Sequence, residues 1–132
     1  MLSELSVDSH YRAQLIDITS AINKIVRGAG LDEGACIVYT PHTTAAITVN
    51  ENADPSVVTD IIHTFDNIIP WADPAYRHGE GNSAAHIKSS LFGCSCTLII
   101  KDGQLLLGTW QGVFLCEFDG PRTRKVYVRI SG

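Results

Sequence analysis

The chain has 132 residues, of which 45% are hydrophobic and 18% are charged, so it is long enough for one domain core and too short for two. Its net charge is −4, from 10 Lys and Arg against 14 Asp and Glu, which argues against the broad basic surface that binds nucleic acid. No apolar run approaches the roughly 18–20 residues that cross a bilayer. We therefore expect one domain over residues 1–132, located in the cytoplasm, with neither nucleic acid nor membrane as a partner.

The first half of the chain alternates between strand and helix signals. Apolar residues recur with helical spacing from Ile18 to Ala29, and Gly28 and Gly30 end that stripe. Two short apolar runs follow, separated at Pro41, and both are rich in residues that favour strands. We predict strands over residues 11–17, 34–39 and 45–50 and a helix over residues 18–29.

The second half begins with two helix start signals and ends in strands. Asp54-Pro55 places an N-cap before a proline at the first helical position, and Asn82-Ser83 is the second start. Asp102-Gly103 between two apolar runs indicates a hairpin. We predict helices over residues 55–69 and 83–92 and strands over residues 94–100, 104–107, 113–118 and 125–130. Strands at both ends around central helices predict an α+β layer fold.

The four cysteines form no C-x-x-C pair, and each lies within or beside an apolar run. A disulfide scaffold and a zinc knuckle are therefore both disfavoured. We expect the four thiols to be free and buried.

A glycine-rich stretch, His78-Gly79-Glu80-Gly81-Asn82, leads into the second predicted helix. Within that helix we expect the apolar positions Ala84, Ile87 and Leu91 to face the core. His86 lies roughly opposite this stripe and one turn beyond Asn82, so both side chains should project from the polar face.

His42 lies at the break between two predicted strands, where irregular backbone can direct a polar side chain into a cleft. Together with His78 and His86 it would supply three imidazoles, the donors that a transition metal such as zinc prefers. The alternative is that each histidine is an ordinary exposed residue of a helix or turn.

Two carboxylates, those of Glu51 and Glu117, are candidates for a functional role. Glu51 follows an apolar strand and has no evident capping role, whereas Asp54 next to it is an N-cap. Glu117 shares a strand face with apolar residues, so it needs a partner when buried. Arg122 is a candidate partner, and arginine also suits bidentate contact with phosphate. A structural ion pair and a functional one fit Glu117 equally well.

Taken together, these segments resemble the YjbQ-like protein family. The resemblance spans nearly the whole chain and is carried by His42-Thr43-Thr44-Ala45-Ala46, Asn50-Glu51, His78 to Asn82 with His86, and Gly108-Thr109-Trp110-Gln111 through Glu117 to Arg122. It implies a YjbQ-like α+β fold of mostly antiparallel sheet layers with two to three helices, assembled as a homotrimer.

The resemblance also implies a site that holds a divalent metal ion, for which zinc is one candidate, or a small phosphorylated or anionic molecule. His42, His78 and His86 would line it, and Asn82 and Gln111 would help to bind the ligand. The activity implied is a weak thiamine-phosphate synthase, a transferase reaction.

In that reaction Glu51 or Glu117 would be the acid–base group and Arg122 would hold a substrate phosphate. The same residues fit a metal-dependent hydrolase or lyase, or a homotrimer that binds ligands or stabilises its own interface without catalysis.

Overall fold

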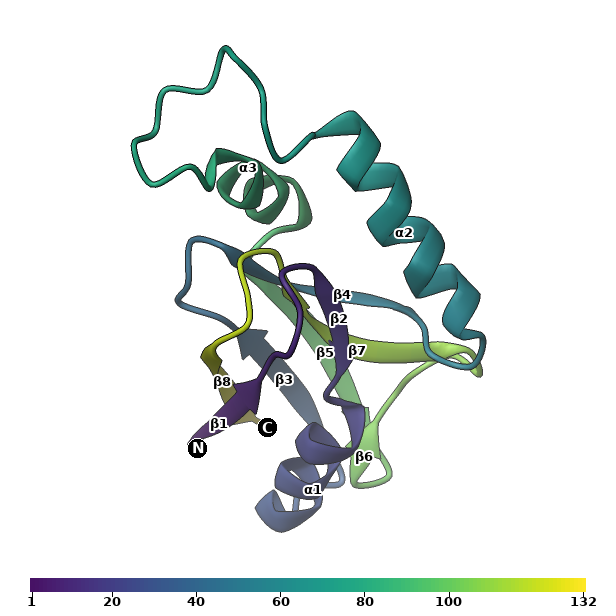
Figure 1. The fold of residues 1–132 in the computed structure, drawn as a ribbon. Helices are drawn as coiled ribbons and strands as arrows, with labels where there is room; N and C mark the ends of the chain where they lie inside the picture. Colours follow the sequence, from purple (N-terminus) through teal and green to yellow (C-terminus); the bar gives the residue numbers. More distant parts are fainter.

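Two antiparallel sheets of unequal size pack against each other and carry three helices (Figure 1). The computed structural model describes residues 1–132. The larger sheet has five strands in the order β1-β8-β3-β5-β6, and the smaller sheet has three in the order β2-β7-β4. The strands are β1 (Leu2–Asp8), β2 (Gln14–Asp17), β3 (Glu33–Tyr39), β4 (Ala45–Glu51), β5 (Ser95–Lys101), β6 (Gln104–Leu105), β7 (Gln111–Glu117) and β8 (Thr123–Ser131). The helices are α1 (Thr19–Ala29), α2 (Pro55–Ile68) and α3 (Ser83–Phe92). None of them is long and apolar enough to span a membrane.

Strand β7, in the middle of the smaller sheet, is buried on both of its faces. Side chains alternate along a strand, so Val113 and Leu115 join the core between the two sheets and α1. Phe114 and Cys116 point the other way, into a second core with Ala85 of α3 and side chains of α2. The chain's own helices therefore cover the second apolar face that the sequence shows over residues 113–118.

Most predicted elements are confirmed, with small shifts at their ends. The helix starts at Asp54-Pro55 and Asn82-Ser83 are correct, and residues 102–103 form the turn between β5 and β6. Asp54 caps α2 by accepting the N–H of Ser56 at 2.9 Å. The prediction missed β1, an edge strand with mostly polar or half-exposed residues, and began β2 three residues early. The α+β class, with antiparallel sheets and helices, is confirmed.

The buried face of α3 differs from the predicted one. Ile87 and Leu91, expected in the core, are exposed, while Lys88 and Ser89 are buried. Each buried polar group has a partner: the Ser89 hydroxyl donates to the carbonyl of Ala45 at 2.7 Å, and the Lys88 ammonium binds Asp66 of α2 at 2.5 Å. Polar side chains with such partners can be buried, because the hydrogen bonds offset the free energy of removing them from water. A prediction from hydrophobicity alone therefore chose the wrong face of α3.

The cysteines also differ in part from expectation. All four are free, and Cys36 and Cys116 are buried, but Cys96 is half-buried and Cys94 is exposed. Burial raises the pKa of both Cys36 and Cys96 to about 11, so these two thiols stay protonated at neutral pH.

A buried ion pair closes one end of the space between the sheets. Glu117 ends β7 and is fully buried, and Arg124 on β8 is 1% exposed. The Arg124 Nε donates to Glu117 Oε1 at 2.9 Å, and its terminal nitrogen binds Glu117 Oε2. Ser9 donates to Oε1 at 2.7 Å, and the N–H of Asp119 donates to Oε2 at 3.0 Å. The same arginine binds the carbonyl and hydroxyl of Thr44, so three loops are tied to one ion pair.

Replacing Glu117 by Gln should lower the free energy of unfolding by about 3–5 kcal/mol, because the buried Arg124 charge loses its counterion. The double variant Glu117→Gln, Arg124→Met should lose less than the sum of the two single changes. Urea denaturation of the four proteins measures this coupling. An unchanged unfolding midpoint for Glu117→Gln would show that the ion pair does not stabilise the fold.

The same pair predicts a pH dependence of stability. Burial alone would raise the pKa of Glu117, but the hydrogen bonds from Arg124, Ser9 and the Asp119 N–H outweigh it and hold the pKa below its ordinary value of 4.5. The resulting stabilisation is fully present above pH 4.5 and is lost as the pH falls through the folded-state pKa.

Candidate functional site

The connection between α2 and α3, residues 69–82, is called the histidine loop here because it carries His78. It projects beyond the two helices in Figure 1. The loop is held near both ends. At its start, the guanidinium carbon of Arg12 lies 4.3 Å from the centre of the Trp71 ring. At its end, Asn82 Nδ2 donates to the carboxylate of Asp119 at 2.8 Å.

His78 on this loop and His86 on α3 lie against each other. Their ring centres are 5.3 Å apart and their planes are nearly perpendicular, at 87°. The start of α3 at Ser83 turns the chain so that these two imidazoles, eight positions apart, meet. The structure thus brings together two of the three histidines singled out in the sequence.

The histidine pair lines an open hollow of about 480 Å³, which we call the anion hollow. Its other polar walls are Arg77, Ser83 and Tyr76. No carboxylate lines it, but the Oε1 atom of Glu80 lies 4.0 Å from His78 Nε2. Ser83 is the first residue of α3, so the partial positive charge of the helix N-terminus lies at this wall. Sequence reasoning missed Arg77 and Ser83 as site residues, although both adjoin the motif. The arrangement suits an anion, because it combines the Arg77 guanidinium with imidazole and hydroxyl groups that can donate hydrogen bonds.

His42 is committed to a different contact. Its Nε2 accepts the backbone N–H of Lys125 at 2.9 Å, which fixes the β3–β4 loop to β8. Burial lowers its pKa, and the nearby Arg124 charge lowers it further, so the neutral imidazole is favoured. Within this chain, no three His, Cys, Asp or Glu side chains are arranged to hold a metal ion. A site formed by His42, His78 and His86 stays a prediction. With the chain in this conformation, such a site would need residues from more than one chain.

His42 should titrate below its ordinary pKa of 6.5. As the pH falls, His42 is protonated in the unfolded chain before it is protonated in the folded protein. Neutral His42 therefore stabilises the fold above pH 6.5, and this contribution is lost as the pH falls through the folded-state pKa. A pH titration of the histidine ring resonances by NMR measures the pKa, with His42→Ala to assign the signal. A value above 6.5 would contradict the observed contact with Lys125.

Two other predicted site residues lie elsewhere. Glu51 and Gln111 face each other across β4 and β7, at the opposite end of β7 from Glu117. With a rise of about 3.4 Å per residue, the length of β7 separates them from Glu117 by roughly 20 Å. Glu51 lines a separate hollow of about 320 Å³ together with Asp17 and Asp54. Neither Glu51 nor Gln111 is among the residues that line the hollow of the histidine pair.

The suggested partner of Glu117 was wrong. Arg122 is half-exposed and binds Asp119 instead. Its guanidinium donates to the backbone carbonyl and to the carboxylate of Asp119, each at 2.9 Å. The partner of Glu117 is Arg124, which the sequence could have indicated. Val126, Val128 and Ile130 alternate inward along the last strand, and the same period places Arg124 on that inward face.

Both oxygens of Glu117 are occupied by hydrogen bonds, which favours a structural role for this residue. Its acid–base role stays a prediction. Asn82, expected to bind a ligand, is 8% exposed, and its Oδ1 atom has no hydrogen-bond donor.

The fold and this site define a small α+β protein that has a histidine-lined hollow and a buried ion pair. The chain belongs to the YjbQ family, because the family model described as "UPF0047 protein YjbQ-like" matches residues 3–132.

Relatives and solved structures agree with this assignment. The chain is 48% identical to the UPF0047 protein YugU of Bacillus subtilis over 132 residues, covering 100% of both chains. It is 53% identical to a UPF0047 protein of Methanocaldococcus jannaschii over 134 residues, covering 100% of this chain and 95% of the relative. A crystal structure of a YjbQ/UPF0047 family protein from Clostridium acetobutylicum superposes with a TM-score of 0.95 at 50% identity, covering 98% of this chain and 99% of that one. These names state the family and specify no reaction.

Proposed function

We propose that the anion hollow binds a small phosphorylated molecule. The observation that carries this proposal is the lining itself, in which Arg77, His78, His86 and Ser83 gather at the start of α3. No lining residue is a carboxylate, and Glu80, whose Oε1 lies 4.0 Å from His78 Nε2, is 75% exposed. Hydrogen bonds between cationic groups and phosphate oxygens are shorter and stronger than neutral ones. The N–H groups at the helix N-terminus add to the same attraction.

We further propose that the reaction at this site is the thiamine-phosphate synthase activity that the family resemblance implies. Joining a pyrimidine diphosphate to a thiazole phosphate releases pyrophosphate, so charge must be stabilised as it departs. We infer that Arg77 and the histidine pair, which line one hollow, stabilise that charge. Non-catalytic binding of the same anion is the alternative, and the full occupation of Glu117 by structural hydrogen bonds favours it.

A divalent metal such as zinc needs three protein ligands in an open catalytic site. One chain offers only the adjacent pair His78 and His86, because His42 is bound to the Lys125 backbone. The residues of a single chain thus do not fit a complete metal site.

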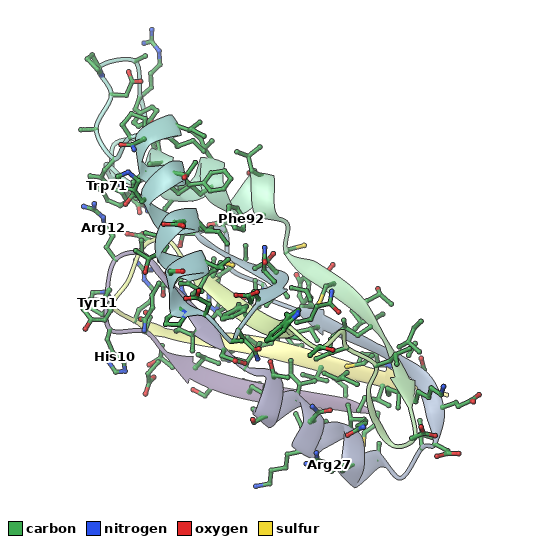
Figure 2. All side chains as sticks on the ribbon, turned by 90° about the vertical axis from the view of Figure 1, so that its right-hand side faces the viewer. His10, Tyr11, Arg12, Arg27, Trp71 and Phe92 are labelled. Atoms are coloured by element: carbon green, nitrogen blue, oxygen red, sulfur yellow. The ribbon has the colours of Figure 1, made fainter.

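Inorganic phosphate should bind the wild-type protein, and His86→Ala and Arg77→Ala should each weaken binding about tenfold or more, the loss expected for a charge-assisted hydrogen bond. Isothermal titration calorimetry measures the affinities. His63→Ala and Arg27→Ala are matched controls, because His63 is exposed on α2 and Arg27 lies on α1, at the far end of the molecule (Figure 2). Equal losses in the controls, or no binding by wild type, would refute the anion site.

Thiamine-phosphate formation should be assayed with the same proteins, and with Glu51→Gln and Glu117→Gln after their folding is checked. An acid–base group contributes about 10²- to 10⁴-fold to the rate. Phosphate binding without any turnover would support the non-catalytic alternative and reject the synthase activity.

We also propose that the chain assembles as a homotrimer. The outer face of the five-stranded sheet exposes the large apolar side chains Ile37, Tyr39 and Ile99, and Tyr39 stacks on Tyr127 with ring centres 6.4 Å apart. An apolar patch of this kind is typical of a surface that contacts another protein. Self-association would cover it.

Light scattering should therefore give a mass of three times 14.3 kDa. Ile99→Lys should lower that mass, because it places a charge in the patch, whereas Ile68→Lys at the end of α2 should not. Both side chains are exposed, at 60% and 66%, so neither change should disturb folding. A wild-type mass of a single chain at micromolar concentration would reject the trimer.

A further inference from the structure

A second hollow of about 480 Å³ adjoins the anion hollow along the histidine loop. The two share Tyr76 and His78 as lining residues, so both hollows border the same two side chains of the loop. The second hollow is lined by Trp71, Ala72, Asp73, Pro74, Tyr76, His78 and Gly81. Trp71 lines only this hollow, whereas Arg77 lines only the neighbouring one, and this exchange of an indole for a guanidinium distinguishes the two.

The two largest rings of this second hollow are fixed by polar partners. Trp71 is covered by the guanidinium of Arg12, whose own backbone carbonyl accepts the N–H of Gly120 at 3.1 Å. Trp71 also packs against the core beneath α2 and α3. The hydroxyl of Tyr76 donates to the carbonyl of Pro70 at 2.8 Å. Figure 2 shows Arg12 and Trp71 together at one end of the molecule. Rings held in this way form a wall that loses little freedom when a ligand binds.

The charge of the second hollow sets a further condition on its occupant. Its one carboxylate is that of Asp73, whose Oδ1 accepts the N–H of Ala75 at 2.8 Å. A negative charge there disfavours a second anion. The ligand portion that enters must therefore be flat, apolar on its faces and uncharged or cationic.

We propose that this second hollow is a subsite for an aromatic ring, whose attached phosphate lies in the anion hollow. The position of the phosphate rests on the proposed function, while the ring subsite rests on Trp71 and Tyr76. The ligand class is an aryl phosphate ester. Arg12 is a positioning residue in this site, since it touches Trp71 and does not line either hollow.

Three probes of matched chemistry test the subsite: inorganic phosphate, glycerol phosphate and phenyl phosphate. The wild-type protein should bind phenyl phosphate about 3- to 10-fold more tightly than glycerol phosphate, the gain expected from one aromatic contact. Trp71→Leu should abolish this preference without changing the affinity for inorganic phosphate, and Trp71→Phe should retain it. Arg12→Ala should reduce the preference, and Arg12→Lys should restore part of it.

Tryptophan fluorescence gives a readout that a merely structural effect would not move. The chain has two tryptophans, and Trp110 is exposed in the β6–β7 connection, so Trp110→Phe leaves Trp71 as the single reporter. Phenyl phosphate should change its emission more than glycerol phosphate does.

The outcomes separate the two proposals. If inorganic phosphate binds and phenyl phosphate is no tighter than glycerol phosphate, the ring subsite is wrong and the anion hollow stands. If phenyl phosphate binds through Trp71 but is insensitive to Arg77→Ala and His86→Ala, the subsite stands and the anion hollow is wrong. If no probe binds to the wild-type protein, both proposals are overturned.

Discussion

The ion pair between Glu117 and Arg124 is the contact on which the arrangement of the loops near the histidine loop depends. Two charges removed from water are stable only when every remaining donor and acceptor is satisfied. Ser9, Thr44 and the Asp119 backbone supply those partners, and each belongs to a different loop. The requirement to satisfy one buried pair therefore fixes the loops after β1, β3 and β7 relative to the two sheets.

Asp119 connects this frame to the proposed site. Its N–H binds Glu117, while its carboxylate accepts Asn82 at the end of the histidine loop and also Arg122. The loop is thus linked to the ion pair through a single residue at one end, and to Arg12 through Trp71 at the other. Between these two anchors most residues are exposed, which leaves the loop accessible to a ligand on both sides. Motifs that are far apart in the sequence gather here because they satisfy one another's hydrogen bonds.

The sequence predicted the parts of the fold that depend on local chemistry. The cap at Asp54, the start at Ser83 and the turn at Asp102-Gly103 are signalled by residues within one turn of the feature. The buried face of α3 was mispredicted, because the cost of burying Lys88 and Ser89 is offset by hydrogen bonds to Asp66 and to the Ala45 carbonyl. Both partners are distant in the sequence. Among site residues, the proximity of His78 and His86 followed from the helix start. The backbone partner of His42 could not have been foreseen, since it depends on how β8 packs beside β3.

We propose that the hollow lined by the histidine pair accepts an anion. The most direct test is an NMR titration of the uniformly ¹⁵N-labelled protein with inorganic phosphate at constant ionic strength. The ring signals of His78 and His86 and the backbone amide of Ser83 should shift together with one dissociation constant, while His10 and His63 should not respond. Shifts spread equally over all five histidines, or no shift at His78 and His86, would contradict it.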